Sequence, residues 1–141
     1  MDEDRELELI RKRKFQALQR YATDVQQRSG FPDHPVNVTD LDYNETIGKY
    51  PMVVVDFWAP WCQPCKMVTA VIDSLSKEMQ GKVVFVKLNV DENPLTTKAN
   101  DVLSIPTMLI YREGRLVDRF VGTQTRSSLT ERLDRHMASD E

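Results

Sequence analysis

From residue 36 onwards, apolar runs typical of strands alternate with amphipathic runs typical of helices, which narrows the folds open to this chain. The predicted strands cover residues 36–38, 52–58, 83–89, 107–111 and 116–121. The predicted helices cover residues 39–47, 62–78, 94–100 and 125–136. Thr39 or Asp40 is expected to cap the first of these helices, and Leu129 and Leu133 are expected to face inward on the last. Helices between strands imply parallel crossovers, whereas the turn at Glu113-Gly114 predicts an antiparallel hairpin. We therefore expect an α/β fold with a central mixed sheet covered by helices on both faces.

The amino-acid composition of the chain changes near Gly30, which separates an N-terminal segment from the rest. Acidic residues open the first segment and the basic run 11–14 follows, an order that suits a helix macrodipole. Apolar residues recur there at helical spacing: Leu7, Ile10, Phe15, Leu18, Tyr21, Ala22 and Val25. We expect an N-terminal helical extension at 1–30, a proline-containing linker at 31–35 and the main domain at 36–141. Whether the apolar stripe packs on its own domain or on a second copy stays open, so we expect a monomer or a dimer through this helix.

Composition excludes several classes of protein. Charged residues make up 29% and hydrophobic residues 40%, as in ordinary globular domains. The net charge of −3 gives no chain-wide basic surface, so we do not expect a nucleic-acid partner. The apolar run 52–58 is interrupted by Asp56 and is too short to span a bilayer. Residues 1–6 lack the pattern of a secretory signal, and we expect a cytoplasmic protein with no membrane association.

The only two cysteines, Cys62 and Cys65, lie three positions apart where a predicted strand gives way to a helix. Pro64 is tolerated in a first helical turn, so it places the helix start next to Cys62. Free N–H groups and the helix dipole favour a thiolate there. Residues three apart on a helix are close enough for a disulfide. The sequence predicts a redox pair with Cys62 as nucleophile and Cys65 as resolving thiol.

Two other uses of the cysteines are conceivable. A structural zinc site needs two further ligands, and the only histidines, His34 and His136, do not have the spacing of a zinc finger or knuckle. We therefore expect no metal. Unreactive core cysteines are the other alternative, but a proline between them at a helix start is hard to explain as core filling.

Asp56 lies within an otherwise apolar strand, where an ionised carboxylate is costly and its pKa tends to rise. Lys87 alternates with Val84 and Val86 on the next strand, so it shares a face with Asp56 if the register permits. A purely structural ion pair between Asp56 and Lys87 is the alternative to a catalytic role.

The segment 55–67, Val-Asp-Phe-Trp-Ala-Pro-Trp-Cys-Gln-Pro-Cys-Lys-Met, resembles the thioredoxin family, and the similarity continues through 87–91, 105–107 and 121–122. It covers about residues 36–137. The resemblance implies the thioredoxin fold and a protein-disulfide reductase that works through a Cys62–Cys65 disulfide without a bound cofactor. It also implies disulfide-containing protein substrates and recycling by a thioredoxin reductase.

The same resemblance assigns roles to further residues. The aspartate matching Asp56, with Lys87 as its partner, takes a proton from the resolving thiol. The proline matching Pro106 is cis beside the disulfide, and the backbone before it pairs with the substrate peptide. The docking surface implied in this way comprises Trp61, Gln63, Pro64, Ile105, Pro106, Val121 and Gly122.

Two residues depart from the family pattern. Gln63 stands where most thioredoxins have glycine, and we expect a modest change in redox potential. Ala70 stands in place of a proline that kinks the long helix, so we expect a straighter helix. An alternative function is a redox-inactive or accessory binding module that presents the basic N-terminal helix to a partner protein or to nucleic acid. If a variant that lacks residues 1–30 reduced insulin at an unchanged rate, the helix would be accessory to the main activity.

Overall fold

A computed structural model of the chain describes residues 2–138, except for the side chains of residues 21–29. The predicted stripe members Tyr21, Ala22 and Val25 therefore lie outside the described side chains. The helices are α1 (Asp2–Ser29), α2 (Tyr43–Lys49), α3 (Gln63–Glu78), α4 (Pro94–Ala99) and α5 (Arg126–Ala138). The strands are β1 (Val36–Asn37), β2 (Met52–Trp58), β3 (Val84–Asn89), β4 (Thr107–Arg112) and β5 (Arg115–Val121).

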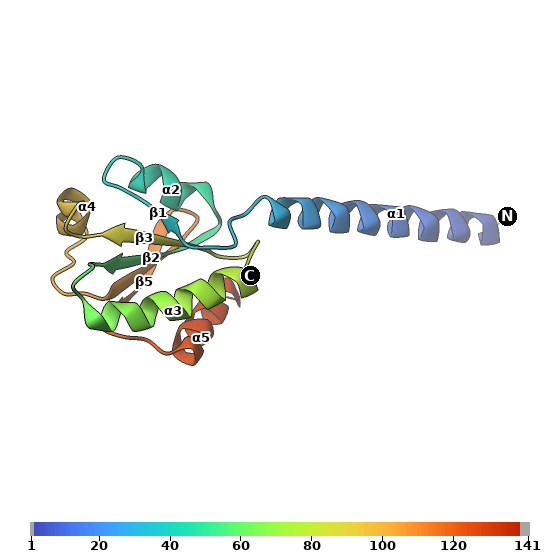
Figure 1. Cartoon of the computed structure of the whole chain (residues 1–141). Helices are drawn as coiled ribbons and strands as arrows, with labels where there is room; N and C mark the ends of the chain where they lie inside the picture. The colour runs from blue at the N-terminus through green and yellow to red at the C-terminus, as the bar shows by residue number, and fades with distance from the viewer. Residues whose placement is uncertain (1, 139–141) are drawn as a thin grey trace.

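The five strands form one mixed sheet in the order β1-β3-β2-β4-β5, so β2 lies at its centre (Figure 1). β3 runs parallel to both β1 and β2, as expected for strands joined by crossovers. β4 runs antiparallel to β2 and to its hairpin partner β5. The turn between β4 and β5 places Glu113 and Gly114 at positive φ, which suits a two-residue hairpin. The predicted mixed sheet is confirmed.

β2 is buried on both sides: its successive residues point to opposite faces of the sheet, and all of them except Trp58 are buried. Met52 and Val54 pack in a cluster with Ile72 of α3 and Leu133 of α5. On the other face, Val53, Val55 and Phe57 pack with Val38 and with Tyr43 of α2. This second cluster contains a buried polar pair, since the Tyr43 and Tyr111 hydroxyls are 2.6 Å apart. The prediction of helices on both faces is therefore confirmed as well.

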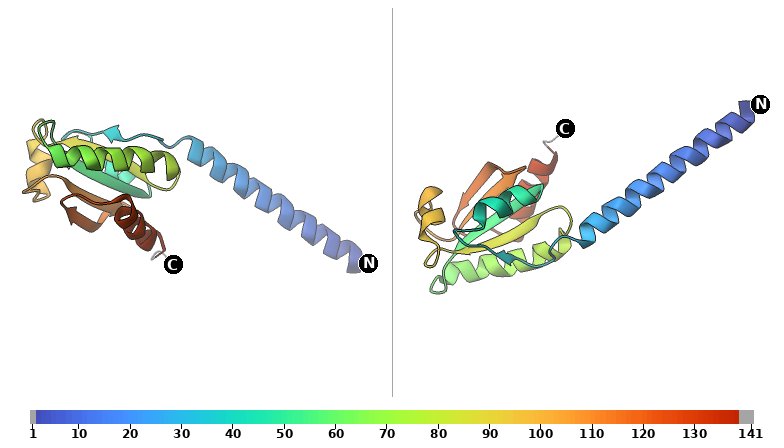
Figure 2. Two further views of the ribbon diagram at one scale, coloured as in Figure 1. Left: turned by 60° about the horizontal axis from the view of Figure 1, so that its bottom comes forward. Right: turned by 90° about the horizontal axis from the view of Figure 1, so that it is seen from above.

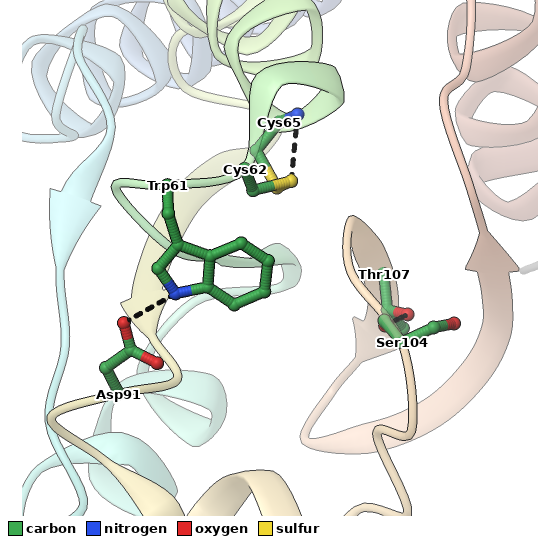
Figure 3. Close-up of a disulfide and its surroundings, with 6 residues drawn as sticks. All are labelled: Trp61, Cys62, Cys65, Asp91, Ser104 and Thr107. Atoms are coloured by element: carbon green, nitrogen blue, oxygen red, sulfur yellow. Dashed lines mark hydrogen bonds between the residues drawn. A yellow bond between two sulfur atoms is a disulfide. The ribbon is translucent and has the colours of Figure 1, made fainter.

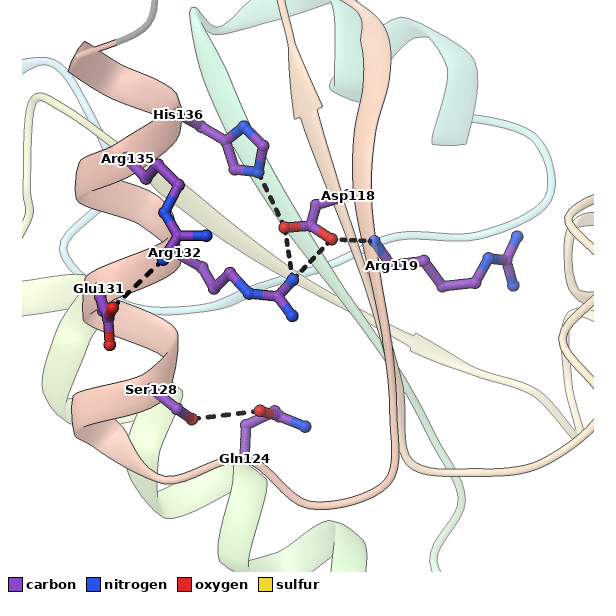
Figure 4. Close-up of polar contacts among 8 residues, drawn as sticks. All are labelled: Asp118, Arg119, Gln124, Ser128, Glu131, Arg132, Arg135 and His136. Atoms are coloured by element: carbon purple, nitrogen blue, oxygen red, sulfur yellow. Dashed lines mark hydrogen bonds and ion pairs between the residues drawn. The ribbon is translucent and has the colours of Figure 1, made fainter.

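Asp118 of β5 fastens the C-terminal helix to the sheet (Figure 4). Its carboxylate accepts hydrogen bonds from Arg132 Nη1 at 2.7 and 2.8 Å, and His136 Nε2 lies 2.8 Å from Oδ2. The Arg132 guanidinium also lies over the Phe120 ring, 4.4 Å from its centroid. These contacts fix the last two turns of α5 against the edge strand.

Most predicted element boundaries agree with the structure to within two residues, but one was wrong by more. The helix expected from Thr39 or Asp40 begins only at Tyr43. Asp42 accepts a hydrogen bond from the Thr39 N–H at 2.6 Å, which closes a turn there instead. Asp40 caps a different helix, because its carboxylate accepts the N–H groups of Leu95 and Thr96 in the first turn of α4. The local sequence signal was a helix cap, but for a partner 55 residues further along the chain.

α1 forms one continuous helix that extends away from the sheet, leaving it at the end opposite the N-terminus of α3 (Figures 1 and 2). All side chains of residues 2–20 are exposed. The predicted stripe residues Leu7, Ile10, Phe15 and Leu18 are 48% to 66% exposed. The chain's own domain therefore does not cover these stripe residues.

Candidate active site

The two cysteines lie at the junction of β2 and α3 and form a disulfide (Figure 3). Cys62 is the N-cap residue of α3, and its Sγ accepts a hydrogen bond from the Cys65 N–H at 3.2 Å. Pro64 lies in the first turn of the helix, as predicted. The Cα atoms of Cys62 and Cys65 are 5.4 Å apart, an ordinary separation for a disulfide. The Cys62 sulfur therefore lies at the positive end of the α3 dipole, where a thiolate is stabilised.

Asp56 is fully buried on the face of β2 that α3 covers. Neither of its carboxylate oxygens has a hydrogen-bond partner among the described residues. Burial raises the pKa of Asp56 from 3.8 to about 7, and the Lys87 charge opposes this rise only in part. A carboxyl group that titrates near neutral pH can both accept and release a proton under ordinary conditions.

Lys87 lies opposite Asp56 in the register of β2 and β3, so the two side chains share a face of the sheet. Its ammonium group lies 4.5 Å from the centroid of the Trp58 ring. Lys87 is not hydrogen-bonded to Asp56, so the pair does not form a close structural ion pair. Lys87 and Trp58 line one small pocket together with both cysteines.

An open groove runs beside the disulfide and brings together five residues of the predicted docking surface: Gln63, Pro64, Ile105, Pro106 and Gly122. The Ile105–Pro106 peptide bond is cis, as expected from the resemblance. The Pro106 carbonyl accepts the Gly122 N–H at 2.9 Å, which holds the two sides of this surface together. The neighbouring Val121 is 63% exposed. Sequence reasoning missed three residues that also line the groove, which are Lys66, Met67 and Thr123.

Trp61 stands exposed next to the disulfide and is held in place by Asp91 (Figure 3). Its indole Nε1 donates a hydrogen bond to Asp91 Oδ2 at 2.9 Å. The Asp91 backbone N–H is in turn bound to the Asn89 side chain at 3.0 Å. Sequence reasoning did not single out Asp91 as a site residue, although it ends the segment 87–91 in which the family resemblance was noted.

The described part of the chain carries neither a metal cluster nor a membrane span. Within residues 2–138 no group of three or more histidine, cysteine, aspartate or glutamate side chains is arranged to hold a metal ion. None of the helices in that range combines the length and the apolar character needed to cross a membrane.

Comparisons with known proteins agree with this geometry. The Thioredoxin family model matches residues 34–135. A thioredoxin from Staphylococcus aureus (strain Mu50 / ATCC 700699) is 43% identical over 102 residues, which cover 72% of this chain and 97% of the relative. Among solved structures, a mutant thioredoxin from Halobacterium salinarum NRC-1 superposes with a TM-score of 0.70 at 29% identity, covering 74% of this chain and 92% of that chain.

A second solved structure is described as the structural basis of the thiol resolving mechanism in yeast mitochondrial 1-Cys peroxiredoxin via glutathione/thioredoxin systems. One of its chains matches with a TM-score of 0.65 at 28% identity, covering 71% of this chain and 93% of that chain. The family match and the Cys62–Cys65 disulfide at the start of α3 lead to one identification. The chain belongs to the thioredoxin family and is a thiol-disulfide oxidoreductase that reduces protein disulfides.

Proposed function

We propose that Cys62 attacks disulfides of other proteins and that Cys65 completes their reduction. The observation that carries this assignment of roles is the position of the Cys62 sulfur at the N-terminus of α3, where it accepts the Cys65 N–H. A thiolate at that position is stabilised by the hydrogen bond and by the helix dipole. Cys65 is the third residue of the helix, and it donates its backbone N–H to the Cys62 sulfur rather than accepting such a bond at its own sulfur.

The reaction has two exchange steps that balance in atoms and electrons. The Cys62 thiolate attacks one sulfur of the substrate disulfide, forming a mixed disulfide and releasing the other substrate sulfur as a thiolate that takes up a proton. The Cys65 thiol then loses its proton and attacks Cys62 Sγ, which forms the Cys62–Cys65 disulfide and releases the second substrate sulfur as a thiolate that also takes up a proton. The substrate gains two electrons and two protons, and the enzyme becomes oxidised.

Asp56 is the proposed acceptor of the Cys65 proton. It lies on the β2 face covered by α3, the helix that carries Cys65. Its pKa of about 7 suits a group that accepts a proton at neutral pH, because a carboxylate of ordinary pKa would be a much weaker base. Lys87 lowers that pKa through its charge, so it is the proposed positioning partner that keeps part of Asp56 ionised.

The substrate is proposed to lie in the groove beside the disulfide. Trp61 and Val121 offer exposed apolar surface at its margins, and Ile105 and Pro106 line its wall. An extended peptide can pair with the exposed backbone before Pro106, as strands pair in a sheet. Gln63 and Pro64 complete the wall from the α3 side.

The remaining proposals concern the context of the reaction. A thioredoxin reductase would return the Cys62–Cys65 disulfide to the dithiol, since each turnover leaves the enzyme oxidised. We place the protein in the cytoplasm, where such a dithiol is kept reduced. The catalytic domain acts as a single unit that needs no second copy for the chemistry.

The proposal is tested by dithiothreitol-driven reduction of insulin with the wild type, Cys62→Ser and Cys65→Ser. We expect both variants to lose turnover, because each lacks one of the two sulfurs that the cycle needs. Full activity of Cys62→Ser would overturn the assignment. A variant lacking residues 1–30 is the companion measurement, and unchanged insulin reduction by it would show that α1 has no part in the reaction.

A further inference from the structure

α1 presents an apolar and charged surface that the rest of the chain leaves uncovered. Leu7 and Ile10 are 51% and 48% exposed, although both are side chains that usually find a partner on a long helix. The reductase mechanism makes no use of this helix. A partner outside the chain's own domain is therefore needed to cover this surface.

Four residues of α1 lie on one narrow seam. Glu3, Leu7, Ile10 and Lys14 follow each other at intervals of four, three and four residues, which is the spacing of the inner positions of a coiled coil. The two apolar members lie in the middle of the seam and one charge lies at each end. The acidic end comes first and the basic end last.

We propose that α1 pairs antiparallel with α1 of a second copy of this chain, with Leu7 and Ile10 packed across the two-fold axis. In this arrangement Leu7 of one copy faces Ile10 of the other, and Glu3 of one copy faces Lys14 of the other. Each contact occurs twice because of the symmetry. The apolar contacts between Leu7 and Ile10 are then flanked at each end by an ion pair between Glu3 and Lys14.

The residues that flank the seam fit the same arrangement. Asp4 and Arg11 lie on one side of the seam, and antiparallel pairing brings Asp4 beside Arg11 of the second copy. Glu6 and Arg13 lie on the other side and meet in the same way. Like Glu3 and Lys14, each of these four charges meets one of opposite sign.

Other arrangements of the same two helices bring like charges together. A parallel pair would place Glu3 against Glu3 and Lys14 against Lys14 within the seam, and only one flanking contact, Glu6 with Arg11 of the second copy, would join opposite charges. An antiparallel pair shifted by seven residues in one direction would place Arg11 against Arg11, and a shift in the other direction would place Asp4 against Asp4. Charge complementarity therefore selects one orientation and one register of the second copy.

The interface is small. The paired segment spans residues 2–15, which is about 21 Å of helix at about 1.5 Å per residue. A contact between two such segments falls below the usual size of a stable protein interface, so the dimer should depend on concentration and on ionic strength. Because α1 leaves the domain at the end opposite the N-terminus of α3, both active sites stay accessible in the dimer (Figures 1 and 2).

Sedimentation equilibrium of the full chain tests the proposal. We expect a monomer–dimer equilibrium at about 0.02 M ionic strength that shifts to monomer at about 0.5 M, because the charge pairs are screened. A parallel or purely apolar dimer would be unchanged or strengthened by salt, and that result would overturn the proposed arrangement. A chain that stays monomeric at low salt and high protein concentration would overturn pairing altogether, whatever other ligand α1 then binds.

Exchanging the charges makes the test specific. An acidic variant (Arg11→Glu, Arg13→Glu, Lys14→Glu) and a basic variant (Glu3→Lys, Asp4→Lys, Glu6→Lys) should each dissociate roughly 100-fold more readily, while an equimolar mixture should dimerise again. The matched control is Glu8→Lys with Lys12→Glu, which swaps charges on the face away from the seam and should leave the equilibrium unchanged. Insulin reduction should stay at the wild-type rate in all variants. Dimers that persist in both interface variants would overturn the proposal.

Discussion

The buried carboxyl group of Asp56 should make the stability of the oxidised protein depend on pH. In the folded chain its pKa is about 7, whereas an exposed aspartate has a pKa of 3.8. Because the folded state binds the proton more tightly than the unfolded state, the contribution of Asp56 to the free energy of unfolding is largest below about pH 4. It is lost progressively as the pH rises from about 4 to about 7 and changes little above that.

The size of the effect follows from the two pKa values. Each unit of difference corresponds to about 1.4 kcal/mol, so the full loss is about 4 kcal/mol. Between pH 5 and pH 8 the loss should amount to roughly 2 to 3 kcal/mol. Asp56→Asn removes this titration while nearly preserving the size of the side chain, although its buried amide adds a cost that does not vary with pH.

The assay is urea-induced unfolding of the oxidised wild type and Asp56→Asn at several pH values from about 5 to about 8. The stability of the variant relative to wild type should rise with pH by the amount given above. Asp40→Ala serves as a control, because the pKa of Asp40 is lowered by its hydrogen bond to Thr96 and its titration is complete below this range. A wild-type and an Asp56→Asn curve that run parallel across this pH range would refute the reasoning.

Three further predictions concern docking and packing. Trp61→Ala should lower kcat/KM for insulin by about tenfold, because it removes exposed apolar surface and the bond to Asp91, and an unchanged value would contradict a docking role. Val121→Glu should raise KM for insulin by about tenfold and spare the reduction of a small disulfide reagent, and equal losses with both substrates would argue against docking. Tyr43→Phe should lower the free energy of unfolding by about 1 kcal/mol in urea, since the buried Tyr111 hydroxyl loses a partner, and a neutral effect would contradict that account.

Much of the fold was predictable because local patterns and tertiary contacts agree. The apolar run 52–58 was predicted as a strand, and it forms β2, the central strand, which is buried on both sides. Pro64 limited the start of α3 to within a residue or two of Cys62, because a proline fits only a first helical turn, and the helix begins at Gln63. Leu129 and Leu133 on α5 were expected to face inward and are fully buried. α3 runs unbroken through Ala70, where family members usually have a proline.

The errors and omissions arose where a side chain serves a distant part of the chain. Asp40 was predicted as a possible cap of the helix that directly follows it in the sequence. In the folded chain Asp40 lies beside α4 and caps that helix instead. Asp91 lies 30 residues from Trp61 and becomes its partner only when β3 lies beside β2. Nothing in the sequence indicated that the groove is lined by Lys66, Met67 and Thr123. No spacing in the sequence relates α3 to the segment after β5, and only the fold brings the two together.

Trapping the mixed disulfide tests the central claim most directly. The reduced Cys65→Ser variant is incubated with a disulfide-containing protein, and the adduct is mapped by mass spectrometry, with Cys62→Ser treated in parallel. We predict a covalent adduct at Cys62 that accumulates, because the sulfur that would resolve it is absent, and no comparable adduct in Cys62→Ser. An adduct that forms at Cys65 in Cys62→Ser as fast as the one at Cys62 would contradict the assignment of Cys62 as the nucleophile.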